Sequence, residues 1–266
     1  MRIIITGSAG YVGRNLYKAL SEKYEVVGID IVKGDTVDHI HDLKKVDPNS
    51  VLHLFTKNDV LIHLAGRTSV TKSYTDSSVM MDNIKMAWNL KDFPGKIMNA
   101  SSTEVGTGSP YGISKEVTEK LFHTFSDNVV NMRFGNIIGA GMPKGKMITD
   151  FIDMAVNNGL VEHGRVDLMR HFITLDYLIS EILHLIDINH TTSIGHAVVF
   201  SECYCQTSIV LDCILGETNA NSALVYDKIR DNDCNHIKLN RDVPKWDGNV
   251  GVVIKKLIED ARKKAV

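Results

Sequence analysis

Two side chains near the middle of the sequence are spaced for proton transfer. Tyr111 and Lys115 are four residues apart, so on a helix they share one face. A free tyrosine has a pKa of about 10, and its hydroxyl acts as a base near neutrality only when a cation lies beside it. Lys115 offers that cation. The same spacing also arises by chance, and then gives a surface tyrosine and a solvated lysine.

The first thirty residues predict a strand, a glycine turn, a helix and a second strand. The apolar run of residues 1–6 has the length of a strand and leads into the glycine-rich residues 7–13. Apolar residues at four-residue spacing follow, and a second apolar run, residues 25–29, ends in Asp30. These segments form one βαβ unit of the kind that binds a dinucleotide.

Each glycine of this turn has a separate task. Gly7 permits a tight turn, Gly10 lets the backbone approach a pyrophosphate, and Gly13 lets the helix pack closely on the sheet. The free N–H groups at the start of the helix then face the phosphates. Asp30 lies where a carboxylate accepts both hydroxyls of an adenosine ribose and repels a 2′-phosphate. The sequence therefore predicts NAD rather than NADP, and the charge of the nicotinamide ring adds to the field at the tyrosine.

Length and composition are those of a globular protein. The 266 residues are 44% hydrophobic, which is enough for a sizeable core. A net charge of -2 provides no basic field for nucleic acid or an anionic membrane. No apolar stretch approaches the ~20 residues of a membrane span, and the early cofactor turn argues against a cleaved signal. We expect a cytoplasmic protein whose Cys203, Cys205, Cys213 and Cys234 are buried or incidental thiols.

Apolar, strand-like runs alternate with amphipathic segments through the first half of the chain. This alternation predicts an α/β fold, a Rossmann-type doubly wound parallel sheet covered by helices. Residues 59–66 form a buried strand that ends in Ala65 and Gly66, where the backbone can lie against a cofactor at the carboxyl end of the sheet. Residues 96–100 form another strand, followed by hydroxyl side chains and then by Tyr111.

The order of these motifs resembles the extended short-chain dehydrogenases/reductases, the nucleotide-sugar epimerase/dehydratase family. The resemblance rests on Gly-x-x-Gly-x-x-Gly at residues 7–13, the "H-x-A" strand at 63–65, the Ser-Ser strand end at 101–102 and Tyr-x-x-x-Lys at 111–115. It implies a catalytic set in which Tyr111 removes a hydroxyl proton, Lys115 also holds the nicotinamide ribose, and Ser102 hydrogen-bonds the substrate oxygen.

The resemblance also implies further contacts to NAD. A carboxylate at Asp42 can accept a hydrogen bond from the adenine amino group, but Asp42 equally suits the N-cap of a helix, and both interpretations stay open. Besides Tyr111 and Lys115, the residues expected at the cofactor are Gly7, Gly10, Tyr11, Val12, Gly13, Asp30, Asp42, Leu43, Leu64, Ala65 and Gly66.

Three residues are expected to contact a nucleoside-diphosphate sugar. Ser69 lies in a hydroxyl-rich loop that resembles the family's substrate-side loop, although these hydroxyls equally suit a solvated loop. Asn136 can donate its amide to a sugar diphosphate. Arg170 stands where the family grips the diphosphate, which suits the guanidinium fork better than the alternative of a surface ion pair.

The family resemblance implies two domains and a homodimer formed through the helices that start near Asn83 and Tyr111. After Ser201 it is confined to Leu239-Asn240 and a closing helix. The apolar stripe of that helix is expected to pack in the core: Val252, Ile254, Leu257, Ile258 and Ala261. The expected domains are an NAD-binding domain, residues 1–135 with 173–200, and a small C-terminal substrate-binding lobe, residues 136–172 with 201–266.

Glu104 bears on the type of reaction. Ser102-Thr103-Glu104 resembles the Thr-Ser-Glu or Thr-Asp-Glu of the dehydratase and decarboxylase branches. A carboxylate there can remove the C5 proton of a 4-keto sugar, or Glu104 simply caps a turn. Residues 106–110 form a much shorter loop than the one that covers substrate in the family, so the site is either more open or closed by another segment.

The function favoured by these features is an NAD-dependent nucleotide-sugar epimerase, which oxidises its substrate to a 4-keto sugar and then reduces it again. A 4,6-dehydratase or decarboxylase that uses Glu104 is the first alternative. A 4-keto-sugar reductase is the second, and an NAD-sensing scaffold is the alternative without catalysis. The scaffold requires a broken Ser/Tyr/Lys set, whereas all three residues are present.

Overall fold

The computed structural model of the 266-residue chain describes residues 1–45, 55–193, 195–224 and 248–265. The aligned pair Leu239-Asn240 and Cys234 lie outside these ranges. Among the helices described, none has the length and apolar character needed to cross a membrane.

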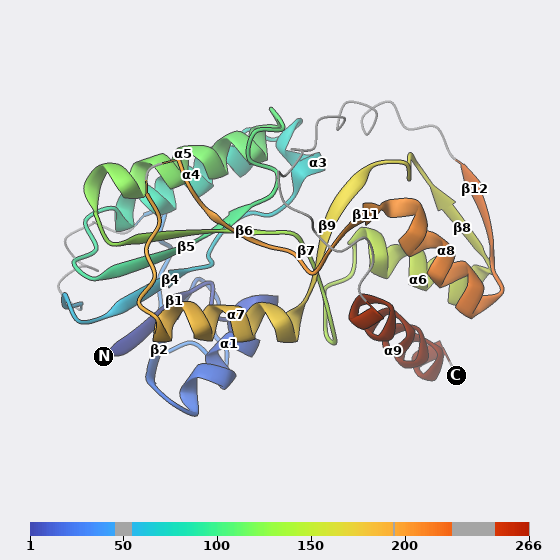
Figure 1. Cartoon of the computed structure of the whole chain (residues 1–266), viewed down its shortest axis with the longest axis horizontal. Helices are drawn as coiled ribbons and strands as arrows, with labels where there is room; N and C mark the ends of the chain where they lie inside the picture. Colours follow the sequence, from blue (N-terminus) through green and yellow to red (C-terminus); the bar gives the residue numbers. More distant parts are fainter. Residues whose placement is uncertain (46–54, 194, 225–247, 266) are drawn as a thin grey trace. The chain divides into compact units, whose positions relative to one another are not determined.

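Contacts divide the chain into two compact units, shown in Figure 1. The first contains residues 1–134 and 179–199, and the second contains 135–178 and 200–266. The division predicted from the sequence places residues 173–178 with the NAD-binding domain instead. Each unit is described by itself.

The first unit is built on a seven-stranded sheet. Its spatial order is β10-β6-β5-β4-β1-β2-β3, and adjacent strands from β3 to β6 run parallel. The chain winds outward from β1 in both directions, which confirms the predicted doubly wound sheet and puts the switch point at the carboxyl ends of β1 and β4. The strands are β1 (Arg2–Thr6), β2 (Glu25–Asp30), β3 (His39–Ile40), β4 (Val60–His63), β5 (Lys96–Ser102), β6 (Val129–Phe134) and β10 (Val198–Phe200).

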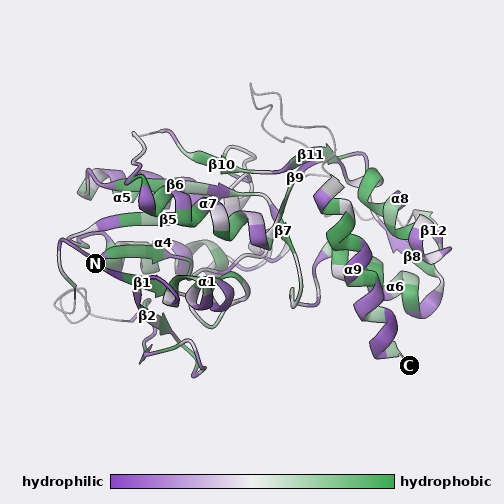
Figure 2. Cartoon of the chain, turned by 60° about the horizontal axis from the view of Figure 1, so that its bottom comes forward, coloured by the Kyte–Doolittle hydropathy of each residue, from purple (hydrophilic) through white to green (hydrophobic). Residues whose placement is uncertain are grey.

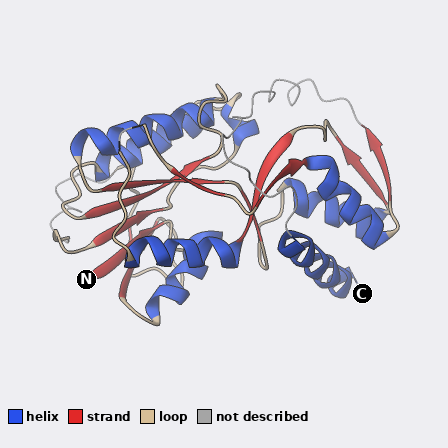
Figure 3. Cartoon of the chain, viewed as in Figure 1, coloured by secondary structure: helices blue, strands red, loops and turns tan. Residues whose placement is uncertain are grey.

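Helices cover both faces of this sheet (Figures 1 and 3). Helices α4 (Ser78–Leu90) and α5 (Pro110–Phe125) lie side by side on one face. Helices α1 (Tyr11–Ser21) and α7 (Leu175–Asp187) lie on the other, and a short helix, α3 (Val70–Ser73), precedes α4. The buried layer beneath α4 and α5 includes Ile4, Leu61, Ile97, Val129, Ala87, Leu90 and Phe122.

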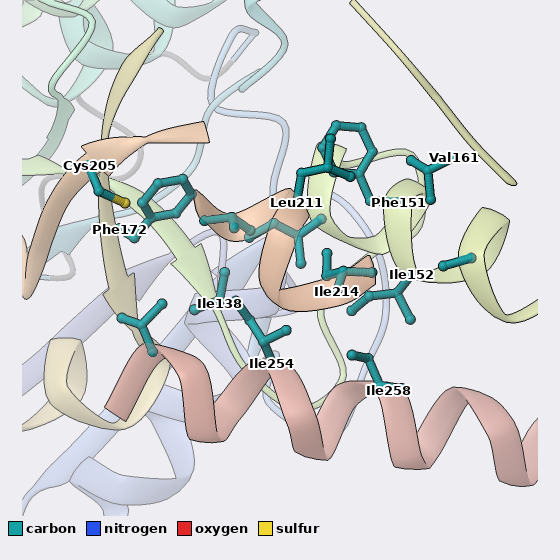
Figure 4. Packing of buried hydrophobic residues seen from close by; sticks show 14 of the residues in the cluster. Ile138, Phe151, Ile152, Val161, Phe172, Cys205, Leu211, Ile214, Ile254 and Ile258 are labelled. Atoms are coloured by element: carbon teal, nitrogen blue, oxygen red, sulfur yellow. The ribbon is translucent and has the colours of Figure 1, made fainter. Parts of the chain in front are cut away.

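In the part of the chain that the structure describes, the second unit combines two small sheets with three helices. Strands β7 (Asn136–Ile138), β9 (Met169–Thr174) and β11 (Cys203–Gln206) form one sheet, and β8 (Leu160–His163) pairs in parallel with β12 (Asn221–Leu224). The helices are α6 (Met147–Asn158), α8 (Thr207–Thr218) and α9 (Gly248–Ala265). Figure 4 shows their shared core, in which Phe172, Leu211 and Ile254 pack together. The thiols of Cys203 and Cys205 are also buried in this core.

Helix α9 has the two-sided character expected of a surface helix, as its colouring in Figure 2 shows. Ile254 and Ile258 are buried in the core, and Leu257 and Ala261 pack against it. The prediction is wrong for Val252, which is 65% exposed. Residues two apart on a helix point in nearly opposite directions, so Val252 cannot share the face of Ile254.

Candidate active site and cofactor pocket

The glycine turn between β1 and α1 is too crowded for side chains. Gly7 has a φ of +74°, and a Cβ there would lie 2.7 Å from the backbone nitrogen of Ala65. A Cβ on Gly13 would lie 2.1 Å from the carbonyl oxygen of Gly7, so the backbone that Gly13 approaches most closely is that of the turn itself. Gly10 caps α1 and provides no side chain to its first N–H groups. The turn thus presents bare backbone at a helix N-terminus, which suits a phosphate.

A cavity of about 430 Å³ opens beside this turn, at the carboxyl ends of β1, β2 and β4. This is the position at which open α/β sheets bind ligands. Its wall contains eight residues of the predicted cofactor set: Gly7, Gly10, Asp30, Asp42, Leu43, Leu64, Ala65 and Gly66. The described residues Tyr11, Val12 and Gly13 belong to the first turn of α1 and do not line it.

The remaining wall residues were not expected from the sequence: Ile29, Ile31, His41, Lys44, Arg67, Asp82 and Met86. Asp82 and Met86 come from α4, which reaches the cavity only through the packing of that helix on the sheet. Arg67 directly follows the predicted wall residue Gly66, and this adjacency is the one sequence signal that could have identified it.

The two acids predicted near the adenosine both accept backbone hydrogen bonds. Asp30 accepts from the N–H of Ala9 at 2.9 Å and from that of Ile31 at 2.7 Å. Asp42 accepts from the N–H of Lys44 at 3.2 Å and therefore caps a turn. Its contact with adenine stays a prediction, since Asp42 also lines the cavity.

Asp82 joins two cations at the edge of the cavity. Its Oδ2 lies 3.3 Å from Arg67 Nη1 and 3.4 Å from Lys44 Nζ. Arg67 forms a second ion pair, in which its Nη2 lies 3.0 Å from Asp76 Oδ2. Both cations of the wall are therefore already paired with carboxylates, and the cavity offers little unpaired positive charge to a ribose phosphate.

The predicted catalytic side chains also lie in the first unit. Ser102 ends β5, while Ser109 caps α5 by accepting from the N–H of Gly112 at 3.0 Å. The first turn of α5 carries Tyr111, and Lys115 follows one turn later; both side chains are buried. The Lys115 ammonium lies 5.9 Å from the centre of the Tyr111 ring, so the expected shared face is present.

Burial dominates the ionisation of Tyr111. It raises the pKa of the phenol to about 12, against a smaller opposing effect from the nearby Ser102 hydroxyl. The carboxylate of Glu104 raises this pKa further. The protein alone therefore holds Tyr111 protonated, and a general base at this position needs an additional positive charge.

Lys115 is held between the tyrosine and the cavity wall. Its Nζ donates to the carbonyl oxygen of Ala100 at 2.7 Å, and a Cβ on Gly66 would lie 3.5 Å from it. Burial lowers the pKa of Lys115 to about 8, and Glu119 partly opposes this shift. The ammonium thus lies beside the wall residue Gly66, although neither Lys115 nor Tyr111 lines the cavity, and its burial is a cost to folding.

This cost makes Lys115→Met a stabilising substitution near neutral pH. A pKa lowered from 10.5 to about 8 corresponds to a loss of roughly 3 kcal/mol in the free energy of unfolding, and the whole of this loss applies below pH 8. Between pH 8 and 10.5 the unfolded chain binds a proton that the folded chain does not, so wild-type stability rises with pH in this window. Urea unfolding at pH 7 and pH 9.5 should show a more stable variant that lacks this rise.

The exposed Lys18 on α1, away from α4 and α5, provides the matched control. Lys18→Met should leave both the stability and its pH dependence close to wild type. A Lys115→Met variant that is less stable than wild type at pH 7 would show that the ammonium contributes more through its hydrogen bond to Ala100 than it costs in burial.

Glu104 belongs to a compact turn that leads into α5. Its backbone oxygen accepts from Thr107 Oγ1 at 2.8 Å, and its carboxylate accepts from the same hydroxyl at 3.3 Å. A Cβ on Gly112 would lie 2.2 Å from the Glu104 carbonyl oxygen, so α5 packs directly on this turn. The two hydrogen bonds with Thr107 support the interpretation that Glu104 caps a turn. Its carboxylate also raises the pKa of Tyr111, so the catalytic interpretation stays open.

Two buried polar residues position the start of α5. Asn83 of α4 accepts from the N–H of Arg67 at 2.8 Å and donates to Ser114 at 3.1 Å, so it joins the cavity wall to the catalytic helix. Ser73 accepts from the N–H of Tyr111 at 3.2 Å. Helix α3 therefore lies against the tyrosine, next to the shortened loop of residues 106–110.

The three predicted substrate residues are not all in one unit. Ser69 caps α3 in the first unit by accepting from the N–H of Lys72 at 3.2 Å. Asn136 and Arg170 belong to the second unit, where Asn136 donates to the carbonyl oxygen of His171 at 3.0 Å and Arg170 lies in β9. Among the described residues, no group of three or more His, Cys, Asp or Glu side chains is arranged to hold a metal ion.

Comparisons with known proteins agree with this geometry. The model of the NAD dependent epimerase/dehydratase family matches residues 3–187. A GDP-6-deoxy-D-talose 4-dehydrogenase of Aggregatibacter actinomycetemcomitans is 26% identical, over 74% of this chain and 76% of the relative. A dTDP-D-glucose 4,6-dehydratase of Dictyostelium discoideum is also 26% identical, over 73% of this chain and 58% of the relative.

Solved structures show the same fold. The NAD-dependent NDP-hexosamine 5,6-dehydratase TunA superposes with a TM-score of 0.78 at 19% identity, over 97% of this chain and 96% of TunA. The family uses NAD or NADP: structures with this fold include one bound to NAD and another bound to NADPH. The chain belongs to the NAD-dependent epimerase/dehydratase family and is an enzyme of the extended short-chain dehydrogenase/reductase type.

Proposed function

We propose that this enzyme is an NAD-dependent nucleotide-sugar epimerase, which oxidises a nucleoside-diphosphate sugar to its 4-keto form and reduces it again. The observation that carries the proposal is the buried set of Ser102, Tyr111 and Lys115 in the unit that also contains the glycine turn and cavity. A scaffold protein has no need for this set. Burying a lysine at a cost to folding instead suits a site selected for chemistry.

The residues divide the proposed proton chemistry between them. Ser102 orients the sugar hydroxyl, Tyr111 takes its proton, and Lys115 stabilises the tyrosinate. Bound NAD supplies the hydride acceptor and a positive ring. With the pKa of Tyr111 at about 12 in the protein alone, that second positive charge lets the phenol act as a base nearer neutrality.

The preference for NAD over NADP is proposed from the charges of the cavity. Asp30, Asp42 and Asp82 line it, and the cations Lys44 and Arg67 are paired with Asp82. A 2′-phosphate would meet carboxylates without an unpaired cation to compensate. The glycine turn supports a dinucleotide pyrophosphate, since Gly7 and Gly10 line the cavity with backbone alone at the N-terminus of α1.

The first test is to denature the purified protein and to identify and count the released dinucleotide. Near-stoichiometric NAD or NADH is expected, because a closed redox cycle returns the cofactor to its starting state. A protein that is empty and binds NADPH from solution would instead favour the 4-keto-sugar reductase and overturn the proposed role of Asp30. A panel of nucleoside-diphosphate sugars then tests epimerisation directly.

Glu104 keeps a 4,6-dehydratase or decarboxylase as the second candidate, since its carboxylate acts on the ionisation of Tyr111. Glu104→Gln keeps an acceptor for Thr107 but removes the charge. We expect the substitution to stop elimination and leave 4-epimerisation within about tenfold of wild type. Products are separated by chromatography, with Glu116→Gln on α5 as the control. Equal loss of both activities would make Glu104 structural.

For the substrate, we propose that Asn136 and Arg170 contact the diphosphate, and that Ser69 is a separate contact to the substrate. The guanidinium of Arg170 suits a phosphate geometrically, and Asn136 offers an amide donor on the neighbouring strand β7. The names of the two relatives, which act on GDP- and dTDP-linked sugars, support this substrate class without identifying the sugar.

A homodimer through α4 and α5 is part of the proposal. Met81 and Trp88 on α4 are 44% and 49% exposed, and Ile113 and Phe125 on α5 are 43% and 46% exposed. Partly exposed apolar side chains on two adjacent helices suit contact with a second copy of the chain. Sedimentation at micromolar concentration should show a dimer, and Trp88→Glu should shift it towards monomer. A monomeric wild type would contradict the proposal.

A further inference from the structure

A row of polar side chains crosses the centre of the main sheet. Thr6, His63, Asn99 and Asn131 occupy matching positions on the adjacent strands β1, β4, β5 and β6. All four are buried, with at most 2% exposed. Central strands of a parallel sheet are normally apolar on both faces, so this row is unusual. The residues two positions earlier on each strand, beneath the same helices, are apolar: Ile4, Leu61, Ile97 and Val129.

One end of the row has a defined direction of hydrogen bonding. The Thr6 hydroxyl accepts from the N–H of Ala65 at 3.3 Å and lies 2.8 Å from Nδ1 of His63. Among the described residues, Nδ1 is the acceptor within hydrogen-bond distance of this hydroxyl. A hydroxyl proton directed at Nδ1 therefore satisfies both groups and places the imidazole proton on Nε2. Burial and the nearby charge of Lys115 lower the pKa of His63 to about 3, so the ring is neutral.

The other end of the row is an incomplete pair of amides. Asn99 Nδ2 donates to Asn131 Oδ1 at 2.9 Å. Among the described residues, Asn99 Oδ1 and Asn131 Nδ2 are fully buried without a hydrogen-bond partner. Both atoms belong to the same pair, and a buried polar atom without a partner is costly. One acceptor and one donor of this pair therefore remain open.

The imidazole supplies a third group. Nδ1 of His63 points to Thr6 on strand β1, so Nε2 on the opposite side of the ring points away from β1. Strand β5 lies on the side of β4 that faces away from β1, and it carries Asn99 in register with His63. Neighbouring strands are about 4.8 Å apart, and the structure contains no direct hydrogen bond between His63 and Asn99. A small group that both donates and accepts would satisfy these atoms.

We propose that this row binds one internal water molecule. The water accepts from His63 Nε2 and Asn131 Nδ2 and donates to Asn99 Oδ1, which gives it the three hydrogen bonds typical of buried water. The row then forms a continuous chain from the N–H of Ala65, a residue of the cavity wall, to Asn131. Thr6 and His63 act as positioning residues for that wall. The water site itself is independent of the proposed reaction.

The direct test is a high-resolution crystal structure of the wild-type protein. We expect an ordered water within hydrogen-bond distance of His63 Nε2, Asn99 Oδ1 and Asn131 Nδ2. Two direct hydrogen bonds between the amides, with no water beside them, would overturn the proposal. This measurement requires no variant and does not depend on the sugar or cofactor.

A double-mutant cycle tests the same site in solution. Asn99→Leu and Asn131→Leu should each lower the urea midpoint, because each leaves the opposite amide buried beside an apolar side chain. The double variant should recover most of that loss, since it also removes the site of the water. Losses that simply add in the double variant would contradict a shared site. Activity is not needed as a readout, so failure here leaves the proposed reaction untouched.

Discussion

Tyr111→Phe is expected to abolish turnover while the protein still retains its dinucleotide. The substitution removes only the phenol oxygen, so the buried ring and its packing beside Lys115 remain. Loss of a general base typically costs about 10²–10⁴ in rate. Turnover with a nucleoside-diphosphate sugar is measured together with the dinucleotide released on denaturation.

Tyr17→Phe is the matched control, because Tyr17 lies on α1 of the same unit and hydrogen-bonds Asp38 at the surface. It should keep full activity and full cofactor content. Thermal unfolding of both variants checks that the fold is intact. Retained turnover in Tyr111→Phe would remove Tyr111 from the mechanism, whereas loss of both turnover and cofactor would assign it a role in cofactor binding.

The sequence predicted the local parts of this site well because their chemistry is local. A strand, a glycine turn and a helix within thirty residues determine their own geometry, and the positive φ of Gly7 follows from the turn that it makes. The four-residue spacing of Tyr111 and Lys115 likewise determines their shared face. The alternation of strands and helices likewise predicted a parallel sheet covered by helices.

Contacts made by packing could not be predicted in this way. Asp82 reaches Lys44 and Arg67 only because α4 lies over the carboxyl ends of β1 and β4. The polar row of Thr6, His63, Asn99 and Asn131 depends on the register of four strands, and no single strand indicates it. Asp42 illustrates an intermediate case: the sequence suggested both a cap and an adenine contact, and the structure shows a cap on the cavity wall.

Gly13→Ala is expected to have the second largest effect, through the shape of the turn. The new Cβ would lie 2.1 Å from the Gly7 carbonyl oxygen and 2.8 Å from the Ser8 Cα, and neither backbone atom can rotate away. Either α1 or the turn must move. Overpacking of this kind costs about 1–3 kcal/mol, and displacement of the first N–H groups of α1 from the pyrophosphate should lower dinucleotide affinity by more than tenfold.

Substitutions at two other glycines separate the effect on folding from the effect on dinucleotide binding. A Cβ on Gly10 would meet only the Gly7 carbonyl oxygen, at 3.1 Å, so Gly10→Ala should disturb folding less while still obstructing the pyrophosphate. Gly216 lies within α8 with nothing inside 4 Å of a Cβ, so Gly216→Ala should stabilise by about 0.5–1 kcal/mol. Urea unfolding and dinucleotide titration are measured on all three variants. If Gly13→Ala binds the dinucleotide like wild type, the helix start has no part in holding it, and the crowded turn serves folding alone.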